Sequence, residues 1–445
     1  MRILSITAGA AEMYCGSCLR DNALAAELLR QGHDVTLMPV YTPTRVDQEN
    51  VSEDRVLLGG VSIYLQQHLA LFRKTPWLLD RLWDSKSFLN LVSKRSIEVN
   101  PKALGALTVA TLLGEHGPQN KEIKKIVHWV RNEKPYEVIN LPNAILIGLA
   151  GPIKHATGQP LCVTLQGEDL FLEGLPQEHH TRALALIREQ IKNVDMFIAV
   201  SDYYKTFMSD YLGIPLDRIR VVPLGVSPED LSPGGRTRLT SDPFTIGYLA
   251  RVAPEKSLDL LAKAYRIFRK DRELGPARLE VAGYLAPEHR PYLQNIKNQL
   301  REWGLENEFH YHGTLNREQK VSFLRSIDVL SVPSTYCEPK GLYLLEAMAC
   351  GVPVVQPNHG AFPEILERTS GGLLVTPNDP DSLADGLAAV RQHPGQAREM
   401  GDRGAANVRK YYSVNHMAEQ MMRVYSDVIK NGNANAPTLQ GLETQ

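Results

Sequence analysis

The sequence has no long hydrophobic stretch, few cysteines and few aromatic residues. No apolar run reaches the roughly 18 residues that a membrane-spanning helix needs, so we expect no transmembrane segment. Five cysteines in 445 residues, an odd number, argue against a disulfide framework and for a reducing compartment. The chain starts with the pattern of a buried strand and without the features of a signal peptide. We therefore predict a cytoplasmic protein.

The chain also lacks an excess of charge of one sign. Lys and Arg number 49, and Asp and Glu number 50. A protein that neutralises many phosphates usually has a clear basic excess, so nucleic acid is not an expected partner. With 43% hydrophobic and 22% charged residues, the composition is typical of a globular protein. A chain of 445 residues is too long for one ordinary core, so we expect two α/β domains.

Short apolar runs alternate with longer helical patterns, which is typical of parallel βαβ units. The first half has these predicted strands: Met1–Ala8, Asp34–Val40, Tyr136–Asn140, Leu161–Leu165, Met196–Val200 and Arg220–Pro223. The second half has these: Phe244–Leu249, Arg278–Ala282, Phe309–His312, Asp328–Val332, Val352–Gln356 and Gly372–Val375. We therefore predict two doubly wound, Rossmann-like domains that face a central cleft, with ligands at the carboxyl ends of the strands.

Three segments interrupt this alternation. Proline, glycine and serine dominate residues 229–242, which we interpret as the linker between the domains. Residues 42–120 are too long for a simple crossover and are predicted to be an insertion with helical patterns such as Trp77–Trp83. Its aromatic residues pack the insertion's own core or form a shallow membrane-surface contact. Residues 431–445 are polar and are predicted to be disordered.

The most informative stretch runs from Glu338 to Glu346, after the predicted strand at 328–332. Glu338 precedes a proline, which places it on a loop. Gly341 permits an unusual backbone conformation, and a helix-forming segment that contains Glu346 begins at Leu342. Backbone amides at Gly341 and Leu342 would face a bound anion. Two carboxylates flanking such amides suit a nucleotide sugar, with its hydroxyls, its diphosphate and its ribose.

This stretch resembles the E-x7-E motif of family 4 glycosyltransferases, retaining enzymes with the two-Rossmann fold known as GT-B. The resemblance covers nearly the whole chain outside 42–120 and the tail. It implies that Glu338 contacts the donor sugar and that Glu346 contacts the ribose. The family usually has an aromatic residue just before the glycine, where this sequence has Lys340.

Two cations, Arg251 and Lys256, lie across a predicted strand-to-helix turn. They can converge on a diphosphate and neutralise the charge that develops as the sugar–phosphate bond breaks. The alternative is ordinary solvated charge, but the family resemblance at both positions favours the diphosphate. Gly247 in the preceding strand, Gly283 after the next strand, and Gly360 in an element that resembles the family's G-x-x-E are the further predicted donor contacts.

The loop after the first strand contains Gly16 and Ser17, and its position indicates an acceptor- or phosphate-facing loop at a helix N-terminus. It is not G-x-G-x-x-G, which disfavours a nicotinamide dehydrogenase. Cys15 and Cys18 in the same loop raise redox or zinc chemistry as an alternative. The sequence has no second cysteine pair or histidine cluster to complete a metal site, so packing of small residues is the favoured interpretation.

Gln166 follows the predicted strand Leu161–Leu165, at a position where the family typically has a histidine in a T-x-H-G pattern. Glutamine donates and accepts hydrogen bonds but does not exchange protons near neutral pH. Gln166 can serve if the position orients the sugar or stabilises charge, which is the interpretation we favour. If the position must carry a proton, Glu168 or Asp169 would have to supply it.

Residues and resemblance together predict a retaining glycosyltransferase that moves a sugar from a UDP- or GDP-type nucleotide diphosphate sugar to a hydroxyl acceptor. The acceptor would be a glycan, a lipid or a small molecule, and a peripheral membrane contact stays open. We expect neither a metal nor a cofactor. The alternatives are a nucleotide-sugar epimerase of the same fold and an inactive nucleotide-sugar-binding protein. The predicted catalytic residues are Glu338, Arg251, Lys256 and Gln166.

The resemblance also assigns a part to each segment of the chain. Residues 1–228 would form the N-terminal domain on the acceptor side, and residues 243–410 the C-terminal domain on the donor side. An amphipathic helix at 411–430 would cross back to the N-terminal domain, as this fold commonly arranges.

Overall fold

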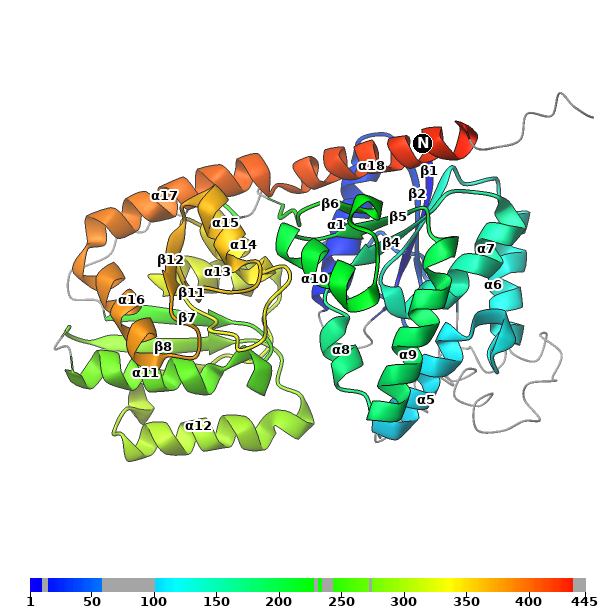
Figure 1. The fold of residues 1–445 in the computed structure, drawn as a ribbon. Helices are drawn as coiled ribbons and strands as arrows, with labels where there is room; N and C mark the ends of the chain where they lie inside the picture. Colours follow the sequence, from blue (N-terminus) through cyan, green and yellow to red (C-terminus); the bar gives the residue numbers. More distant parts are fainter. Residues whose placement is uncertain (10–14, 58–100, 228–230, 234–242, 272–273, 435–445) are drawn as a thin grey trace, which may run out of the picture. The chain divides into compact units, whose positions relative to one another are not determined.

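The structure is a computed structural model that describes residues 1–9, 15–57, 101–227, 231–233, 243–271 and 274–434 (Figure 1). By their contacts, these residues divide into two compact units. Unit 1 contains Met1–Val200, Tyr204–Val222 and the chain from Ala418 on, and unit 2 contains Ser201–Tyr203 and Pro223–Met417. Each unit has its own parallel sheet, and every strand predicted from the sequence is present. The predicted fold class, two doubly wound parallel-sheet units, is confirmed.

Unit 1 is built on a six-stranded parallel sheet with the order β2-β1-β3-β4-β5-β6. Its strands are β1 (Arg2–Thr7), β2 (Asp34–Pro39), β3 (Val138–Leu141), β4 (Leu161–Leu165), β5 (Met196–Ala199) and β6 (Ile219–Val221). Its helices are α1 (Gly16–Arg30), α5 (Pro101–Leu112), α6 (Asn120–Asn132), α7 (Ala150–Thr157), α8 (Asp169–Glu173), α9 (Gln177–Gln190) and most of α10 (Asp202–Leu212). The chain places β2 on one side of β1 and β3 on the other, so the strand order reverses at β1. Open sheets bind ligands at such a reversal.

Unit 2 is built on a second six-stranded parallel sheet, with the order β12-β11-β10-β7-β8-β9. Its strands are β7 (Phe244–Leu249), β8 (Ala277–Ala282), β9 (Phe309–Tyr311), β10 (Val329–Leu330), β11 (Val354–Pro357) and β12 (Gly372–Val375). Its helices are α11 (Leu258–Asp271), α12 (Arg290–Glu302), α13 (Arg317–Ser326), α14 (Leu342–Ala349), α15 (Phe362–Thr369), α16 (Pro380–Gln392), α17 (Pro394–Tyr411) and the start of α18 (Val414–Ala434). This is the strand order of dinucleotide-binding Rossmann domains, and it reverses between β7 and β10.

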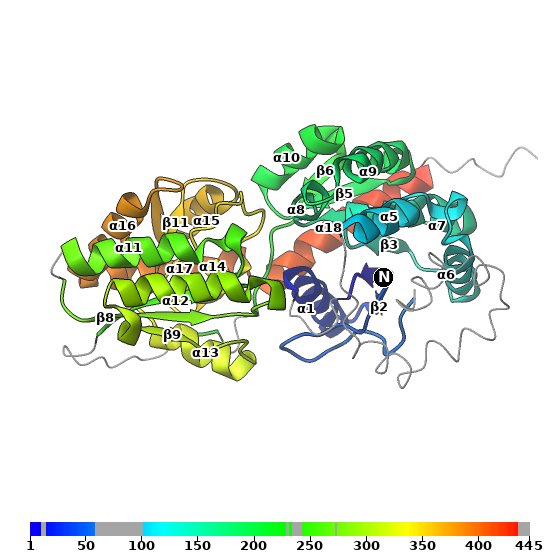
Figure 2. The same ribbon diagram turned by 90° about the horizontal axis from the view of Figure 1, so that it is seen from below.

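Burial on both faces of the unit 2 sheet explains why its central strand β7 is apolar rather than alternating. All six residues of β7 are buried. Helices α11, α12 and α16 cover one face, and α14, α15 and α17 cover the other (Figures 1 and 2). On α11 the buried residues recur with helical spacing, as in Leu258, Leu261, Tyr265 and Phe268, and they pack in one core with β7. The switch point between β7 and β10 therefore sits on a rigid scaffold.

The C-terminal helix differs from the predicted range 411–430. Helix α17 runs to Tyr411, and α18 begins at Val414, where Ser413 Oγ accepts a hydrogen bond from the His416 N–H at 3.2 Å. Such a cap starts a new helix. Helix α18 continues to Ala434, so the first residues of the predicted disordered tail are helical, because extending an existing helix costs little. Residues 435–445 lie outside the described residues.

The predicted insertion and linker are described only in part. Within 42–120 the structure describes α5 and a bridge that pairs Leu37 with Ser52, whereas Trp77–Trp83 lies outside the described residues. Within 229–242 it describes residues 231–233, where Leu231 is buried and Ser232 accepts a hydrogen bond from Arg325. None of the helices in the described ranges combines the length and the apolar character needed to cross a membrane.

Gly283 follows β8 and was predicted to let the backbone approach a ligand. Its φ is 144°, and a Cβ at this position would lie 1.7 Å from the Ala250 carbonyl oxygen after β7. Its N–H donates to the Gly313 carbonyl at 2.8 Å. The structure therefore gives Gly283 a close approach to the chain's own backbone, and a contact with the donor stays a prediction.

We expect Gly283→Ala to lower the free energy of unfolding by about 3 kcal/mol or more, because both the clash and the backbone strain oppose the side chain. Urea unfolding would measure it. Gly304→Ala is the matched control, because Gly304 also has a positive φ of 70° but no atom within 4 Å of a Cβ. It is expected to cost about 1 kcal/mol. Equal losses in the two variants would contradict the role of the Ala250 contact.

Candidate functional site

The carboxylate segment of unit 2 follows β10, at the switch point of the sheet. Gly341 has φ 58° and ψ 44° and is the N-cap of α14, as its predicted backbone freedom requires. No side chain caps this helix start. The amides at the start of α14 therefore have no side-chain acceptor, and Glu338 lies before them on the loop while Glu346 lies inside the helix. This local arrangement agrees with the one predicted from the sequence.

Lys256 and Glu338 form an ion pair, although they are 82 residues apart in the sequence. Their side chains are only 12% and 6% exposed. The pair forms because the segment after β7 and the loop after β10 meet at the switch point, where the two strands are neighbours. A cation and a carboxylate are thus held together where a ligand of this sheet would bind.

Two tyrosines surround this ion pair. The Lys256 Nζ lies 5.7 Å from the ring centroid of Tyr343 and 6.0 Å from that of Tyr336, within reach of cation–π attraction. The Tyr343 hydroxyl donates to Glu338 Oε2 at 3.5 Å. Burial, and then the neighbouring Glu338 carboxylate, raise the pKa of Tyr343 well above its usual value, so its hydroxyl stays a hydrogen-bond donor.

Arg251 has a different partner. Its Nη2 lies 2.7 Å from Glu255 Oε1, and its side chain is 45% exposed. Arg251 and Lys256 thus each pair with a different carboxylate, and their convergence on a diphosphate stays a prediction. An exposed pair of this kind is weak, so Arg251 can exchange Glu255 for a phosphate at little cost.

Glu346 is held by two cations that sequence reasoning missed. Lys320, on α13, forms an ion pair with Glu346 Oε1, and Arg317 Nη1 lies 3.8 Å from the same oxygen. Lys320 and Glu346 are both buried. The sequence offered one weak signal, the run of charged residues at the start of α13 after a glycine turn, and such runs usually mark a solvated helix face.

Gly360 supports the backbone of Glu338. Its φ is 61°, and a Cβ at this position would lie 2.7 Å from both the N and the O of Glu338. The N–H of Ala361 donates to the Glu338 carbonyl at 2.8 Å. The half-buried ring of His359 stands next to this turn, and burial lowers its pKa. The turn that was predicted to touch the donor therefore holds the loop that carries Glu338, and its own donor contact stays a prediction.

Gly247 lies inside β7 and serves packing. It pairs with residues of β8 and β10, its carbonyl accepts from the Ser331 N–H at 2.9 Å, and a Cβ would lie 2.4 Å from Ile327 Cδ1. Its backbone is thus engaged in the sheet. Leu342, in contrast, is the first residue of α14, where the amide faces no capping side chain. Donor contacts at both positions stay predictions.

In unit 1, Gln166 ties together three segments at the carboxyl end of the sheet. Its Nε2 donates to the Pro142 carbonyl at 2.7 Å and to Asp21 Oδ1 of α1 at 3.5 Å. Its backbone N–H donates to Glu168 Oε2 at 2.7 Å. The side chain is almost fully buried. These contacts fit an orienting residue, since glutamine provides the directional hydrogen bonds without a charge.

The two carboxylates after Gln166 are also engaged. Glu168 accepts hydrogen bonds from the backbone of Ala144 at 2.9 Å and from the Tyr204 hydroxyl at 3.3 Å, and Asp169 accepts from the same hydroxyl at 2.7 Å. Burial raises the pKa of Glu168, while the backbone bonds oppose that rise. Both carboxylates thus hold the loop after β4, and a role in proton transfer finds no support in their contacts.

Gly16 and Ser17 lie in the first turn of α1, which begins at Gly16. Cys15 is the N-cap, and its own side chain makes no capping hydrogen bond. A helix N-terminus at this position is compatible with the predicted phosphate- or acceptor-facing turn, and contact with a ligand stays a prediction.

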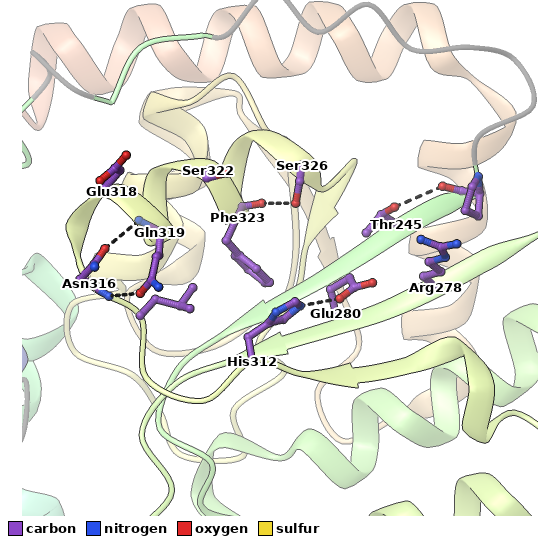
Figure 3. Close-up of a pocket in the computed structure, with 12 residues that line it drawn as sticks. Thr245, Arg278, Glu280, His312, Asn316, Glu318, Gln319, Ser322, Phe323 and Ser326 are labelled. Carbon is purple, nitrogen blue, oxygen red and sulfur yellow. Dashed lines mark hydrogen bonds and ion pairs between the residues drawn. The ribbon is translucent and has the colours of Figure 1, made fainter.

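A groove with a volume of 840 Å³ lies elsewhere in unit 2, between α13 and the strands β7 and β8 (Figure 3). Among its polar side chains, His312 Nε2 lies 2.6 Å from Glu280 Oε2, and Asn316 and Gln319 form a capping box at the start of α13. None of the predicted site residues lines this groove. Within the described part of the chain, no group of three or more His, Cys, Asp or Glu side chains could hold a metal ion.

Comparison with known proteins gives two family matches. Residues 235–407 match the family described as "Glycosyl transferases group 1", and residues 107–230 match "Glycosyltransferase Family 4". The first covers the Arg251, Glu338 and Glu346 segments, and the second covers Gln166. Both families named here agree with the resemblance seen in the sequence.

Individual relatives agree with these families. An uncharacterized glycosyltransferase of Methanocaldococcus jannaschii is 25% identical over 302 residues, which are 65% of this chain and 75% of the relative. The D-inositol 3-phosphate glycosyltransferase of Stackebrandtia nassauensis is 30% identical over 223 residues, 48% of this chain and only 50% of the relative. The Anabaena protein HepE, solved with UDP and glucose, superposes with a TM-score of 0.67 at 18% identity, covering 96% of this chain and 100% of HepE. At this identity the likeness shows a shared fold.

Proposed function

The chain belongs to the glycosyl transferases group 1 family (family 4), and on this basis we propose that it transfers a sugar from a nucleotide diphosphate sugar to a hydroxyl acceptor, with retention at the anomeric carbon. The observation that carries the proposal is the buried ion pair of Lys256 and Glu338 at the switch point of unit 2, beside the uncapped start of α14. A cation, a carboxylate and free amides side by side match the charge pattern of a sugar diphosphate.

Each group on the donor side has a part in this reaction. The amides at the start of α14 bind the diphosphate. Lys256 and Arg251 neutralise the charge that grows on the leaving diphosphate, which lowers the barrier to breaking the sugar–phosphate bond. Glu338 accepts hydrogen bonds from sugar hydroxyls, and Glu346 accepts them from the ribose. Lys256 gives up part of its contact with Glu338 when the phosphate arrives.

The acceptor side supplies orientation rather than a base. Gln166 is anchored by the Pro142 carbonyl and Asp21, so its amide keeps a single orientation for hydrogen bonds to the sugar or acceptor. The leaving phosphate itself accepts the proton of the acceptor hydroxyl on the same face of the sugar. Gly16 and Ser17 provide backbone amides for a phosphate or for the acceptor.

The named relatives support the choice of substrates within this proposal. HepE is solved with UDP and glucose, which supports a UDP-type donor, with a GDP-type donor as the alternative. A D-inositol 3-phosphate glycosyltransferase supports a polyhydroxylated acceptor of small size, although the match spans half of that relative. We also propose that the reaction needs no metal and that it takes place in the cytoplasm. The five free cysteines support the cytoplasmic location.

A thermal-shift panel tests the proposal. Purified protein is heated with UDP-, GDP-, ADP- and TDP-sugars, with and without EDTA. We expect one donor class to raise Tm in the presence of EDTA, since a ligand at 100 times its Kd adds about 2.7 kcal/mol of stability. The shift should disappear in Glu346→Ala and Arg251→Ala, each compared with its own ligand-free Tm.

The outcomes separate the alternatives. No shift with any nucleotide sugar, in protein whose ligand-free melting is cooperative, would overturn the proposal. A shift without any product would indicate a binding protein that has lost activity. Product analysis with the stabilising donor separates a transferase, which releases the nucleoside diphosphate, from an epimerase, which keeps the nucleotide sugar intact.

A further inference from the structure

Two cysteines that the proposed reaction does not use stand together at the start of α1. Cys15 is the N-cap of the helix, and Cys18 is its third residue. Side chains at these two positions lie within reach of each other in any helix, as in the reciprocal contacts of a capping box. The Cys15 thiol is a near enough neighbour of Cys18 to raise the pKa of the Cys18 thiol. Cys15 is partly exposed and Cys18 is buried, so only the first is open to a reagent from solvent.

A buried carboxylate lies beside this pair. Asp21 is three residues after Cys18 on the same helix face and is 2% exposed. Its Oδ1 accepts from Arg20 Nη1 at 3.0 Å, while its Oδ2 has no hydrogen-bond partner. Burial, opposed by the Arg20 charge, raises the pKa of this carboxyl. Asp21 is therefore a buried group with a vacant oxygen that can accept a proton next to the Cys18 thiol.

We propose that Cys15 and Cys18 form a redox-active dithiol site, which closes to a disulfide by exchange with a small-molecule or protein disulfide, and that closure stops sugar transfer. In the first step the Cys15 thiolate attacks the incoming disulfide, forming a mixed disulfide and releasing one thiolate. In the second step Cys18 gives its proton to Asp21 and attacks Cys15 Sγ, releasing the second thiolate. The proton that Cys15 lost on ionising and the proton held by Asp21 pass to the two leaving thiolates, so the partner leaves as two thiols and carries the two electrons.

The order of these steps follows from the surroundings of each sulfur. The partial positive charge of the helix N-terminus favours a thiolate at Cys15. The neighbouring Cys15 thiol and then burial raise the pKa of Cys18, so this thiol stays protonated while both are reduced. Once Cys15 carries the mixed disulfide, it no longer presents the thiol that raises the pKa of Cys18.

The effect on transfer rests on the proposed function. The ring that the disulfide closes contains Gly16 and Ser17, whose amides are the proposed acceptor or phosphate contacts. Joining the N-cap to the third helical residue fixes the backbone between them in the geometry that the disulfide requires. Because a small displacement of a substrate-positioning group costs up to about 100-fold in rate, the reduced form is the active one.

Peptide mapping tests the disulfide independently of activity. Full-length protein is equilibrated with mixtures of reduced and oxidised glutathione, alkylated and digested with trypsin. Cleavage after Arg2 and Arg20 puts both cysteines on one peptide. We expect this peptide to lose the mass of two hydrogens in the wild type and in Cys337→Ser, but in neither Cys15→Ser nor Cys18→Ser. The exposed thiol of Cys337 reports, by its glutathione adduct, that the oxidant has acted.

Transfer is then measured in the Cys337→Ser background, so that an adduct next to Glu338 does not account for any loss. We expect oxidation to lower the rate about 10- to 100-fold, dithiothreitol to restore it, and the additional Cys15→Ser change to abolish this response. The dithiol would be overturned if both cysteines were still alkylated after oxidation, or if Cys15 kept a glutathione adduct. Either result counts only where Cys337 of the wild type has been modified. A disulfide with unchanged transfer would overturn its control of the site. If reduced protein transfers no sugar, the proposed function fails, and the peptide map still decides the dithiol.

Discussion

Replacing Lys256 with methionine is expected to lower kcat/KM for transfer by about 100- to 1,000-fold, as loss of one preorganised charge at a developing anion does. The same change leaves the buried Glu338 carboxylate without its cation. Breaking a buried pair on one side costs about 3–5 kcal/mol of folding free energy. Lys256→Met is therefore expected to be both inactive and less stable, and its rate is measured below its own lowered Tm.

Two further variants separate catalysis from stability. In the double variant Lys256→Met with Glu338→Gln, no buried charge is left unpaired, so stability should recover most of the loss while transfer stays low. Lys256→Arg keeps the positive charge beside Glu338 and should retain more activity than Lys256→Met. If Lys256→Met folds and transfers sugar at the rate of the wild type, the ion pair has no part in catalysis, and the central observation of the proposed function is lost.

Replacing Lys320 with methionine is expected to weaken donor binding about tenfold and to lower stability by about 2 kcal/mol, since Glu346 keeps only the more distant Arg317. Lys320 is a positioning residue: it holds the carboxylate that we propose to bind the ribose. Its loss should therefore raise KM more than it lowers kcat, because the ribose is bound similarly before and during transfer. Calorimetric titration with the nucleoside diphosphate and steady-state rates measure the two effects.

The chain offers a matched control for this prediction. Lys263 also pairs with a carboxylate, Asp259, at 3.4 Å, but both side chains are well exposed. Lys263→Met should cost less than about 1 kcal/mol and leave donor affinity unchanged. Lys320→Arg should keep the affinity within a few-fold of the wild type, because it restores a cation on Glu346. A Lys320→Met protein that is less stable but binds donor normally would mean that Glu346 does not contact the ribose.

Local sequence patterns predicted most of the secondary structure. The strands Leu161–Leu165, Phe244–Leu249 and Gly372–Val375 were predicted with the bounds that the structure has. Such strands are predictable because a sheet covered on both faces requires a short, continuous apolar run between turn residues. An error occurred where a cap decides the boundary, between α17 and α18.

The glycines show the limit of such local inference. A glycine in a motif indicates that some atom comes close to the backbone, but it does not say which atom. At Gly283 it is the Ala250 carbonyl, at Gly247 it is the side chain of Ile327, and at Gly360 it is the backbone of Glu338. These neighbours come from other strands and loops, so the sequence alone could not show whether a bound donor or the chain's own atoms come close to each glycine.

By itself, the sequence determined that the chain forms two parallel-sheet units, that Glu338 precedes a helix and Glu346 lies within it, and that a cation-bearing turn follows β7. Periodicity, turn residues and helix caps act over a few residues, so they can be read along the chain. Only the tertiary structure decided which charges meet: Lys256 with Glu338, Lys320 with Glu346, and Gln166 with Asp21 across 145 residues. These partners depend on the order of the strands, because that order determines which loops lie side by side at the end of a sheet.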